Sequence, residues 1–144
     1  MISIGKLTAA DRADWDALFT GYNQFYQRTL PAQLYDRAWN EFQADTRMHA
    51  LGARLEGKLV GMAHFLVHAS TTAADVCYLQ DLFTDPQARG KGVGRALITE
   101  VTEWARTQNC SRVYWSTQES NATARRLYDQ VAVHRGFILY QISL

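Results

Sequence analysis

The feature that most constrains this chain is a glycine-rich segment, RGKGVGR at 89–95, where the hydrophobic pattern changes from that of a strand to that of a helix. The run VCYLQDLFT before it has the β-branched and aromatic content of a strand, whereas ALITEVTEWA after it repeats apolar residues at helical spacing. Closely spaced glycines let backbone N–H groups turn toward an anion without interference from Cβ atoms, and a helix N-terminus adds unpaired donors. This turn therefore predicts a site for a phosphate or pyrophosphate group.

Two common phosphate-binding motifs do not fit the segment. The Walker motif needs a glycine six residues before its lysine and a serine or threonine after it, but those positions hold Asp85 and Gly92. A dinucleotide-binding fingerprint that starts at Gly92 needs glycine or alanine where this chain has Leu97. An ordinary glycine-rich loop without a ligand remains open from this segment alone.

The order of the other elements indicates the fold class. They are expected, in chain order, as a strand at 2–7, helices at 8–27 and 31–42, a hairpin of strands at 50–57 and 58–70, a strand at 111–117, a helix at 119–135 and a closing strand at 137–144. We expect a single α/β domain over residues 1–144, with a central mixed β-sheet flanked by helices on both faces. The β-α-β step through the glycine-rich turn should be right-handed and parallel.

The composition limits the classes of binding partner and the cellular compartment that we expect. A formal net charge of +1 gives no overall field that would attract nucleic acid or an anionic membrane. The N-terminus does not read as a signal peptide, and no stretch has the length and apolar content of a membrane span. Cys77 and Cys110 occur in no metal-ligand spacing and read as free thiols. We therefore expect a cytoplasmic protein without nucleic-acid or membrane partners.

The glycine-rich segment and its neighbours resemble the GNAT superfamily of N-acetyltransferases. Arg89, Gly92 and Gly94 fit the superfamily's acetyl-CoA motif, (Gln/Arg)-x-x-Gly-x-(Gly/Ala). YLQDLFT before the motif and SNATARRLYDQVAVHRGFILYQ after it resemble the fourth strand, fourth helix and closing strand of the superfamily. The resemblance implies a GNAT-type acyltransferase fold, with acetyl-CoA as the acyl donor and no metal.

The resemblance also assigns residues to the cofactor. It implies that the strand before the glycine-rich turn separates from the next strand and admits the pantetheine arm, while the turn holds the pyrophosphate. The residues that it assigns to cofactor binding are Leu82, Phe83, Thr84, Arg89, Gly90, Lys91, Gly92, Val93, Gly94, Arg95 and Asn121.

Tyr128 is the candidate general acid. It follows Asn121 by nearly two helical turns, so both side chains lie on about the same helix face. The resemblance places this tyrosine near the sulfur, where its phenol is suited to protonate the departing CoA thiolate. A tyrosine that only packs in the core is the alternative.

Asp81 is the candidate general base. An alkyl amine with a pKa near 10.4 is almost wholly protonated at pH 7, so forming the free nucleophile costs roughly 4.6 kcal/mol. Several polyamine acetyltransferases of the superfamily have YLED where this chain has YLQD, and Gln80 cannot accept a proton. The amine proton must then be accepted by Asp81, either directly or through a water, or else by Tyr78 or by a water chain. The residues expected to contact the acceptor are Tyr26, Trp39, Gln80 and Asp81.

A covalent relay through Cys77, with His64 or His68 as its base, is a further alternative, but a cysteine in VCYLQDL reads more readily as a buried core residue. Direct transfer of acetyl to a primary amine of a small metabolite, of the amino acid or polyamine type, is the main prediction. A protein lysine or N-terminus is the alternative acceptor, and a non-catalytic CoA-binding module is the alternative of another class. The apolar segment FILYQISL leaves a homodimer possible.

Overall fold

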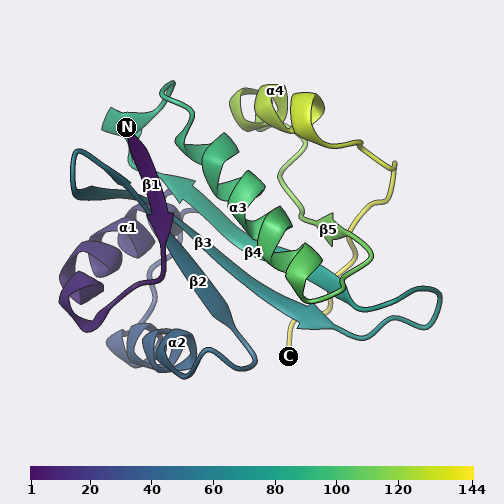
Figure 1. The fold of residues 1–144 in the computed structure, drawn as a ribbon, viewed down its shortest axis with the longest axis horizontal. Helices are drawn as coiled ribbons and strands as arrows, with labels where there is room; N and C mark the ends of the chain where they lie inside the picture. Colours follow the sequence, from purple (N-terminus) through teal and green to yellow (C-terminus); the bar gives the residue numbers. More distant parts are fainter.

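The computed structural model describes residues 1–144 and contains one five-stranded sheet (Figure 1). The strands lie in the order β1-β2-β3-β4-β5; β1 to β4 pair antiparallel with their neighbours, and β4 pairs parallel with β5. Their bounds are β1 Ile2–Gly5, β2 His49–Leu55, β3 Lys58–His68, β4 Val76–Thr84 and β5 Val113–Tyr114. The helices are α1 Arg12–Phe25, α2 Ala32–Ala44, α3 Val93–Thr107 and α4 Ala122–Val131, with 3-10 turns η1 Ala9–Asp11 and η2 Pro86–Ala88.

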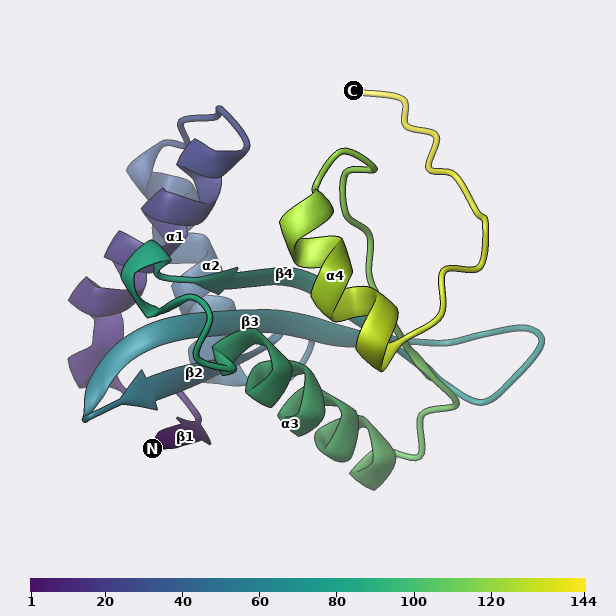
Figure 2. The ribbon, with the colours of Figure 1, turned by 90° about the horizontal axis from the view of Figure 1, so that it is seen from above.

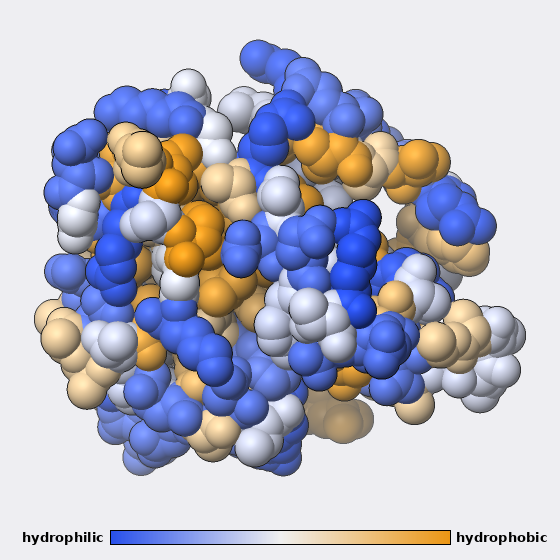
Figure 3. Space-filling view, viewed as in Figure 1, coloured by the Kyte–Doolittle hydropathy of each residue, from blue (hydrophilic) through white to orange (hydrophobic).

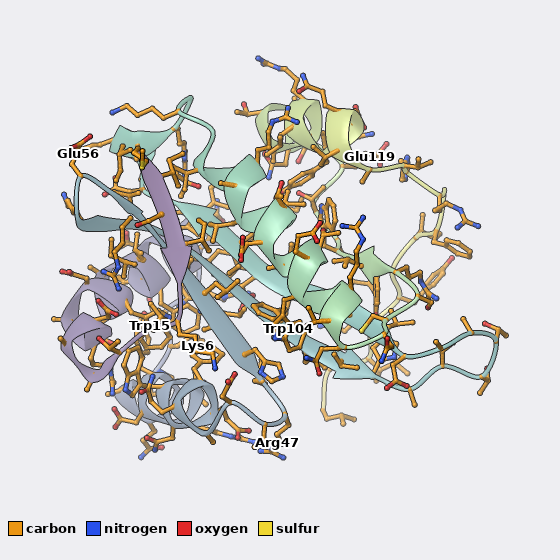
Figure 4. All side chains as sticks on the ribbon, in the orientation of Figure 1. Lys6, Trp15, Arg47, Glu56, Trp104 and Glu119 are labelled. Atoms are coloured by element: carbon orange, nitrogen blue, oxygen red, sulfur yellow. The ribbon has the colours of Figure 1, made fainter.

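Helices cover both faces of the sheet, as predicted. Figure 2 shows α1 and α2 on one side and α3 on the other. Two separate hydrophobic cores result, one under α1 and α2 and one between the sheet, α3 and α4. Trp15 on α1 and Trp104 on α3 mark these cores in Figure 4. The sequence-based expectation of a mixed α/β sheet is therefore confirmed.

The start of the first helical region is set by local hydrogen bonds. The backbone N–H of Thr8 donates to Asp11 Oδ2 at 2.7 Å, and Arg54 Nη2 on β2 donates to the same oxygen at 2.7 Å. A capping box therefore starts the region at the predicted residue and also joins it to the sheet. The helix ends at Phe25, because Gln27 adopts a left-handed conformation with φ of 56°.

A β-bulge in β4 changes the face of the sheet on which its following side chains lie. The pairing with β3 shifts between His64 and Phe65, which lie opposite Asp81 and Leu79. Gln80 is the extra residue of this irregularity. Because side chains alternate along a strand, the extra residue moves Asp81 away from the α3 face, on which Leu79 is buried, to the α1 face.

The predicted closing strand does not form. Residues 137–144 have no strand pairing and follow an extended path away from the sheet (Figure 2). The segment leaves several large apolar side chains uncovered, and Figure 3 shows hydrophobic surface at the upper right, where the chain leaves α4. The strand expected at 111–117 is also shorter than predicted, because only the two residues of β5 pair with β4. A strand requires a neighbouring strand to receive its hydrogen bonds, and local pattern does not supply one.

None of the helices combines the length and the apolar content that crossing a bilayer requires.

Candidate active site

The opening between β4 and β5 is the centre of the candidate site. The two strands pair only at Cys77 with Val113 and at Tyr78 with Tyr114. Beyond Tyr78, β4 continues to Thr84 while the chain after Tyr114 has no strand assignment. The β4 edge that carries Leu82, Phe83 and Thr84 is therefore not paired with β5. Backbone donors and acceptors on such an edge are free to bind an extended ligand.

The glycine-rich turn joins this edge to α3. Gly90 and Gly92 have φ of 78° and 86°, a left-handed conformation that side chains with a Cβ rarely adopt. No heavy atom lies within 4 Å of a Cβ built at Gly90, and only Ile2 Cδ1 lies at 4.0 Å from one at Gly92. The first intrahelical bond of α3 is Ala96 N–H to Gly92 O, so the N–H groups of the first turn have no helical acceptor. These donors fit the phosphate groups of a CoA thioester.

The basic residues of the turn have different environments. Arg89 Nε donates to Thr84 O at 3.3 Å, and its guanidinium lies 5.6 Å from the Phe83 ring centroid. Arg95 donates to Gln130 on α4. Lys91 is exposed and makes no side-chain hydrogen bond. A phosphate ligand would therefore meet a free charge at Lys91 and two arginines that also join the turn to neighbouring segments.

Helix α4 is positioned by Asn121 and by close packing on α3. Asn121 is the N-cap: its Oδ1 accepts from Ala124 N–H at 3.4 Å, and its Nδ2 donates to Thr117 Oγ1 at 3.3 Å. A Cβ at Gly94 would lie 3.2 Å from Leu127 Cδ2, so the small residue allows α3 and α4 to approach. Sequence reasoning assigned Asn121 to the cofactor and missed this capping role.

Tyr128 on α4 is buried and is influenced electrostatically by Tyr26, which follows α1. The Tyr128 ring packs edge-on against Trp115 with centroids 5.4 Å apart. Burial raises the pKa of Tyr128 to about 12, and the hydroxyl of Tyr26 contributes to the rise. Tyr128 therefore keeps its proton across the neutral range. Tyr26 is the C-cap of α1, so the N-terminal helical region contributes to the electrostatic surroundings of the α4 tyrosine.

Asp81 is held by a buried hydrogen-bond chain. Trp15 Nε1 donates to His64 Nε2 at 3.0 Å, and His64 Nδ1 lies 2.9 Å from Asp81 Oδ2. Because an indole N–H can only donate, Nε2 accepts and the ring proton on Nδ1 is directed to the carboxylate. The His64 ring is 1% exposed and stacks on Phe42 at 4.3 Å. This chain orients Asp81 on the α1 face.

The surroundings keep Asp81 ionised. Burial would raise its pKa, but the hydrogen bond from His64, a hydrogen bond from Tyr22 and the charge of Arg28 outweigh burial, so the pKa of Asp81 is lowered. In the same cluster, burial and then the negative charge of Asp81 raise the pKa of Tyr22 above its usual value. Asp81 is thus a carboxylate oriented by His64, with Tyr22 and the cation Arg28 nearby.

Some predicted residues have other positions. Trp39 is buried in the α1–α2 core, 5.2 Å from the Trp15 ring, which favours a packing role over the expected contact with the acceptor. Its helical spacing is equally consistent with core packing. Gln80 is exposed at the bulge. Tyr78 is partly buried, and burial raises its pKa.

The cysteine relay has no geometric basis. Cys77 belongs to the α3-side core, whereas His64 contacts the α1–α2 core on the other face of the sheet. Burial raises the pKa of Cys77 to about 12, which suppresses the thiolate. His68 is bonded to Tyr114 at 2.8 Å and to Ala69 O at 2.9 Å. Acetyl transfer through Cys77 is therefore not supported.

Sequence reasoning did not identify the Trp15–His64 pair or Arg28 as parts of the site. The available signal was weak, because Trp15 has the helical spacing of a core residue and His64 only alternates with His68 along one strand. Their contacts cross 49 residues of sequence for Trp15 and His64, and 17 for His64 and Asp81. No local pattern encodes pairs at these separations.

Comparisons with known proteins agree with this geometry. The sequence model of the Acetyltransferase (GNAT) family matches residues 15–132. The D-amino-acid N-acetyltransferase HPA3 of Saccharomyces cerevisiae is 31% identical over 145 residues, covering 97% of this chain and 89% of that protein. The N-alpha-acetyltransferase RimI of Mycobacterium tuberculosis is 32% identical over 138 residues, covering 93% and 79%.

A solved structure of AAC(6')-Iy with the bisubstrate analogue CoA-S-monomethyl-acetylneamine shares the fold. It has a TM-score of 0.88 at 15% identity, and the match covers 100% of this chain and 99% of that chain. The family match spans the glycine-rich turn, the parted strands and α4, which is the region that holds the candidate site. This chain therefore belongs to the acetyltransferase (GNAT) family and is an acetyl-CoA-dependent N-acetyltransferase.

Proposed function

We propose that this enzyme transfers acetyl from acetyl-CoA directly to the primary amine of a small metabolite of the amino acid or polyamine type. The observation that carries the proposal is the opening between β4 and β5, with the oriented carboxylate of Asp81 on β4 and a mutual electrostatic influence that links Asp81 to Tyr26 and Tyr26 to Tyr128. Relatives named for D-amino acids and for thialysine support a small amine as the acceptor.

Acetyl-CoA is proposed to bind along the parted strands. The N–H groups at the start of α3 and the turn around Gly90 and Gly92 would hold the pyrophosphate, with Lys91 as a free charge. The unpaired edge of β4 at Leu82–Thr84 would bind the pantetheine arm. This placement directs the thioester toward Tyr128 on α4.

Asp81 is proposed to bind the acceptor amine and to receive its proton. A carboxylate with a lowered pKa attracts an ammonium group but is a weak base toward it. The ammonium must first lose one proton to solvent to become a nucleophile, and its second proton passes to Asp81 during attack, because nitrogen becomes far more acidic as it bonds to the carbonyl carbon. A bridging water between the amine and Asp81 serves the same purpose. His64 holds the carboxylate in position during this step.

The backbone and Tyr128 are proposed to act on the carbonyl oxygen and on the departing CoA sulfur. As nitrogen attacks, negative charge gathers on the carbonyl oxygen, where a backbone N–H near Leu82 or Phe83 would stabilise it. The carbon–sulfur bond then breaks, and the Tyr128 hydroxyl donates its proton to the CoA thiolate. The products are free CoA and an N-acetylated amine.

A turnover assay tests the proposed function. Purified protein with acetyl-CoA should release free CoA thiol in the presence of some members of a panel of amino acids, polyamines and short peptides. Turnover only with peptides would move the acceptor to a protein N-terminus or lysine, the class for which RimI is named. Tight acetyl-CoA binding with no turnover on any member would indicate a non-catalytic CoA-binding module.

Gly92→Val should weaken acetyl-CoA binding by about 10- to 100-fold. A β-branched residue at φ of 86° is strained by about 1–3 kcal/mol, and the turn is expected to relieve this strain by rotating its donors away from the phosphates. Isothermal titration calorimetry measures the change in Kd. Gly57→Val is the matched control, because Gly57 has φ of 77° in the β2–β3 turn with no neighbouring atom within 4 Å. Equal Kd values for both variants would contradict the assigned cradle.

We also propose a homodimer in which the C-terminal segment 137–144 packs on a second copy. Five of its side chains, Phe137, Ile138, Leu139, Tyr140 and Ile142, are each more than 70% exposed, and large exposed apolar groups close together in sequence are typical of interaction segments. β5 lies at the sheet edge with β4 as its one neighbour, so a second copy's segment has a strand edge available.

Removing residues 137–144 should convert a dimer into a monomer. The lost apolar contacts are the expected cause, and light scattering after size-exclusion chromatography measures the mass. Gln141→Ala keeps the apolar side chains and should leave the dimer intact. A full-length chain that is monomeric at high micromolar concentration would refute the homodimer.

We propose the cytosol as the compartment of this enzyme, since Cys77 and Cys110 are both free thiols.

A further inference from the structure

Arg28 is fixed at the end of α1 by two bonds to one buried residue. Its backbone N–H donates to Asn23 O at 3.0 Å, and its Nε donates to Asn23 Oδ1 at 2.9 Å. Asn23 is 2% exposed, and its Nδ2 donates to Tyr35 OH at 3.3 Å on α2. The left-handed Gln27 turns the chain back so that both bonds form. The guanidinium is therefore preoriented, although the residue is exposed.

The charge of Arg28 has no carboxylate partner within ion-pair distance. Its guanidinium carbon lies 5.4 Å from the Tyr22 ring centroid and 5.3 Å from that of Tyr26. Nε is bonded to Asn23, while both terminal nitrogens have no acceptor in the structure. Arg12, by contrast, forms ion pairs with two aspartates. The planar pair of free nitrogens on Arg28 suits a carboxylate, which it can bind with two parallel hydrogen bonds.

Arg28 also faces open space and lies near Asp81. It lines a cavity of about 430 Å³ beside α1 and the start of α2, whose lining also includes Arg12, Asp16 and Tyr35 but not Asp81. Its positive charge contributes to the lowered pKa of Asp81. The tyrosines at 22 and 26 contact Arg28 through their rings, and the charge of Asp81 raises the pKa of each. A fixed cation and a fixed anion thus flank one aromatic cluster.

We propose that Arg28 binds a carboxylate of the acceptor, so that the enzyme acetylates amino acids in preference to amines without an acid group. The inference rests on the proposed function, in which Asp81 binds the amine. A zwitterionic acceptor satisfies both charges at once, with its ammonium toward Asp81 and its carboxylate toward Arg28. A polyamine would bring a second cation toward Arg28, which is unfavourable by Coulomb repulsion. The charge arrangement therefore selects the amino acid within the broader class.

The test compares matched acceptors in the wild type and in Arg28→Gln. The acceptors are amino acids, their carboxamides and the corresponding decarboxylated amines, for example phenylalanine, phenylalaninamide and phenethylamine, and lysine with cadaverine. In Arg28→Gln, kcat/KM for the amino acids should fall by about 10- to 100-fold, mainly through a rise in KM. Values for the carboxamides and amines should change by less than about 3-fold. Intrinsic differences in amine pKa cancel, because each acceptor is compared across variants.

Two further variants separate carboxylate binding from a structural role. Arg28→Lys keeps the charge but lacks the planar fork, and it should fall between the wild type and Arg28→Gln for amino acids only. Arg37→Gln removes the same charge from the exposed face of α2 and should keep the wild-type preference. A thermal unfolding scan confirms that each variant is folded. An equal loss for acids and amides in both Arg28 variants would indicate a structural role and overturn the inference.

The outcomes distinguish this inference from the proposed function. Wild-type turnover of amines and carboxamides with no preference for the matching amino acids overturns carboxylate binding and leaves the N-acetyltransferase function intact. Absence of turnover with every small amine overturns the proposed function and, with it, this inference.

Discussion

Asp81→Asn should lower kcat/KM for amine acetylation by about 10²- to 10⁴-fold, the usual contribution of a positioned proton acceptor. Asparagine has nearly the same shape, and its Oδ1 can still accept from His64 Nδ1, so the hydrogen-bond chain to Trp15 is expected to persist. What disappears is the negative charge that attracts the ammonium group and receives its proton. Steady-state CoA release over a range of acceptor concentrations measures the loss.

The control for Asp81→Asn is Asp75→Asn, which removes an exposed carboxylate immediately before β4 and should keep wild-type rates. Calorimetry should give the same acetyl-CoA affinity for both variants, because neither residue is assigned to the cofactor. A loss below about tenfold in Asp81→Asn would contradict its role as proton acceptor and move that role to a water chain.

The pH profile follows from the direction of the Asp81 shift. Because the pKa of Asp81 is lowered from 3.8, the carboxylate stays ionised as the pH falls through the neutral and mildly acidic range. The decline of kcat/KM on acidification should therefore track protonation of the acceptor amine. Acceptors with lower amine pKa values, such as carboxamides, should shift that limb to lower pH. If the acidic decline of kcat/KM occurs at the same pH for every acceptor, it reflects the titration of a group on the enzyme instead.

Tyr128→Phe should lower kcat by about 10²-fold or more while acetyl-CoA affinity stays near the wild-type value. The hydroxyl is protonated at every working pH, since burial raises the pKa of Tyr128 to about 12. Phenylalanine keeps the ring packed on Trp115 and removes only the proton donor. Rapid-quench measurement of the first turnover isolates the chemical step from product release.

Tyr140→Phe provides the matched control, because it removes one hydroxyl from an exposed tyrosine that lies beyond the end of α4. Its kcat should equal that of the wild type. If Tyr128→Phe retains full single-turnover rates, the thiolate leaves without a proton from this residue, and Tyr128 serves only to pack the α3–α4 core.

Much of the cofactor region follows from short-range properties of the chain. A glycine at positive φ, a helix N-terminus with unpaired N–H groups and a strand that ends at Asp85 and Pro86 each depend on a few neighbouring residues. For this reason the turn at 89–95 and α3 were predictable, and so was the mixed sheet covered on both faces.

The acceptor side was only partly predictable, because its residues meet through long-range contacts. Tyr26 and Asp81 could be proposed as candidates, but Trp39 has the same helical spacing as a surface aromatic and proves to be core. Arg28 carries no local signal at all. Its importance arises from the hydrogen bond to Asn23, from the two tyrosine rings and from its electrostatic effect on an aspartate of another element.

By itself, the sequence determined the glycine-rich turn, the order of strands and helices as far as α4, and membership of a family that binds acyl-CoA, since these depend on local conformation and on residue identity at fixed spacing. Only the tertiary structure decided which face Asp81 occupies. One extra residue at Gln80 reverses the alternation of β4, and that bulge is defined by the register with β3 and not by the residues of β4 alone. The same dependence on a partner explains residues 137–144, where an apolar strand pattern is present but no edge of this chain pairs with it.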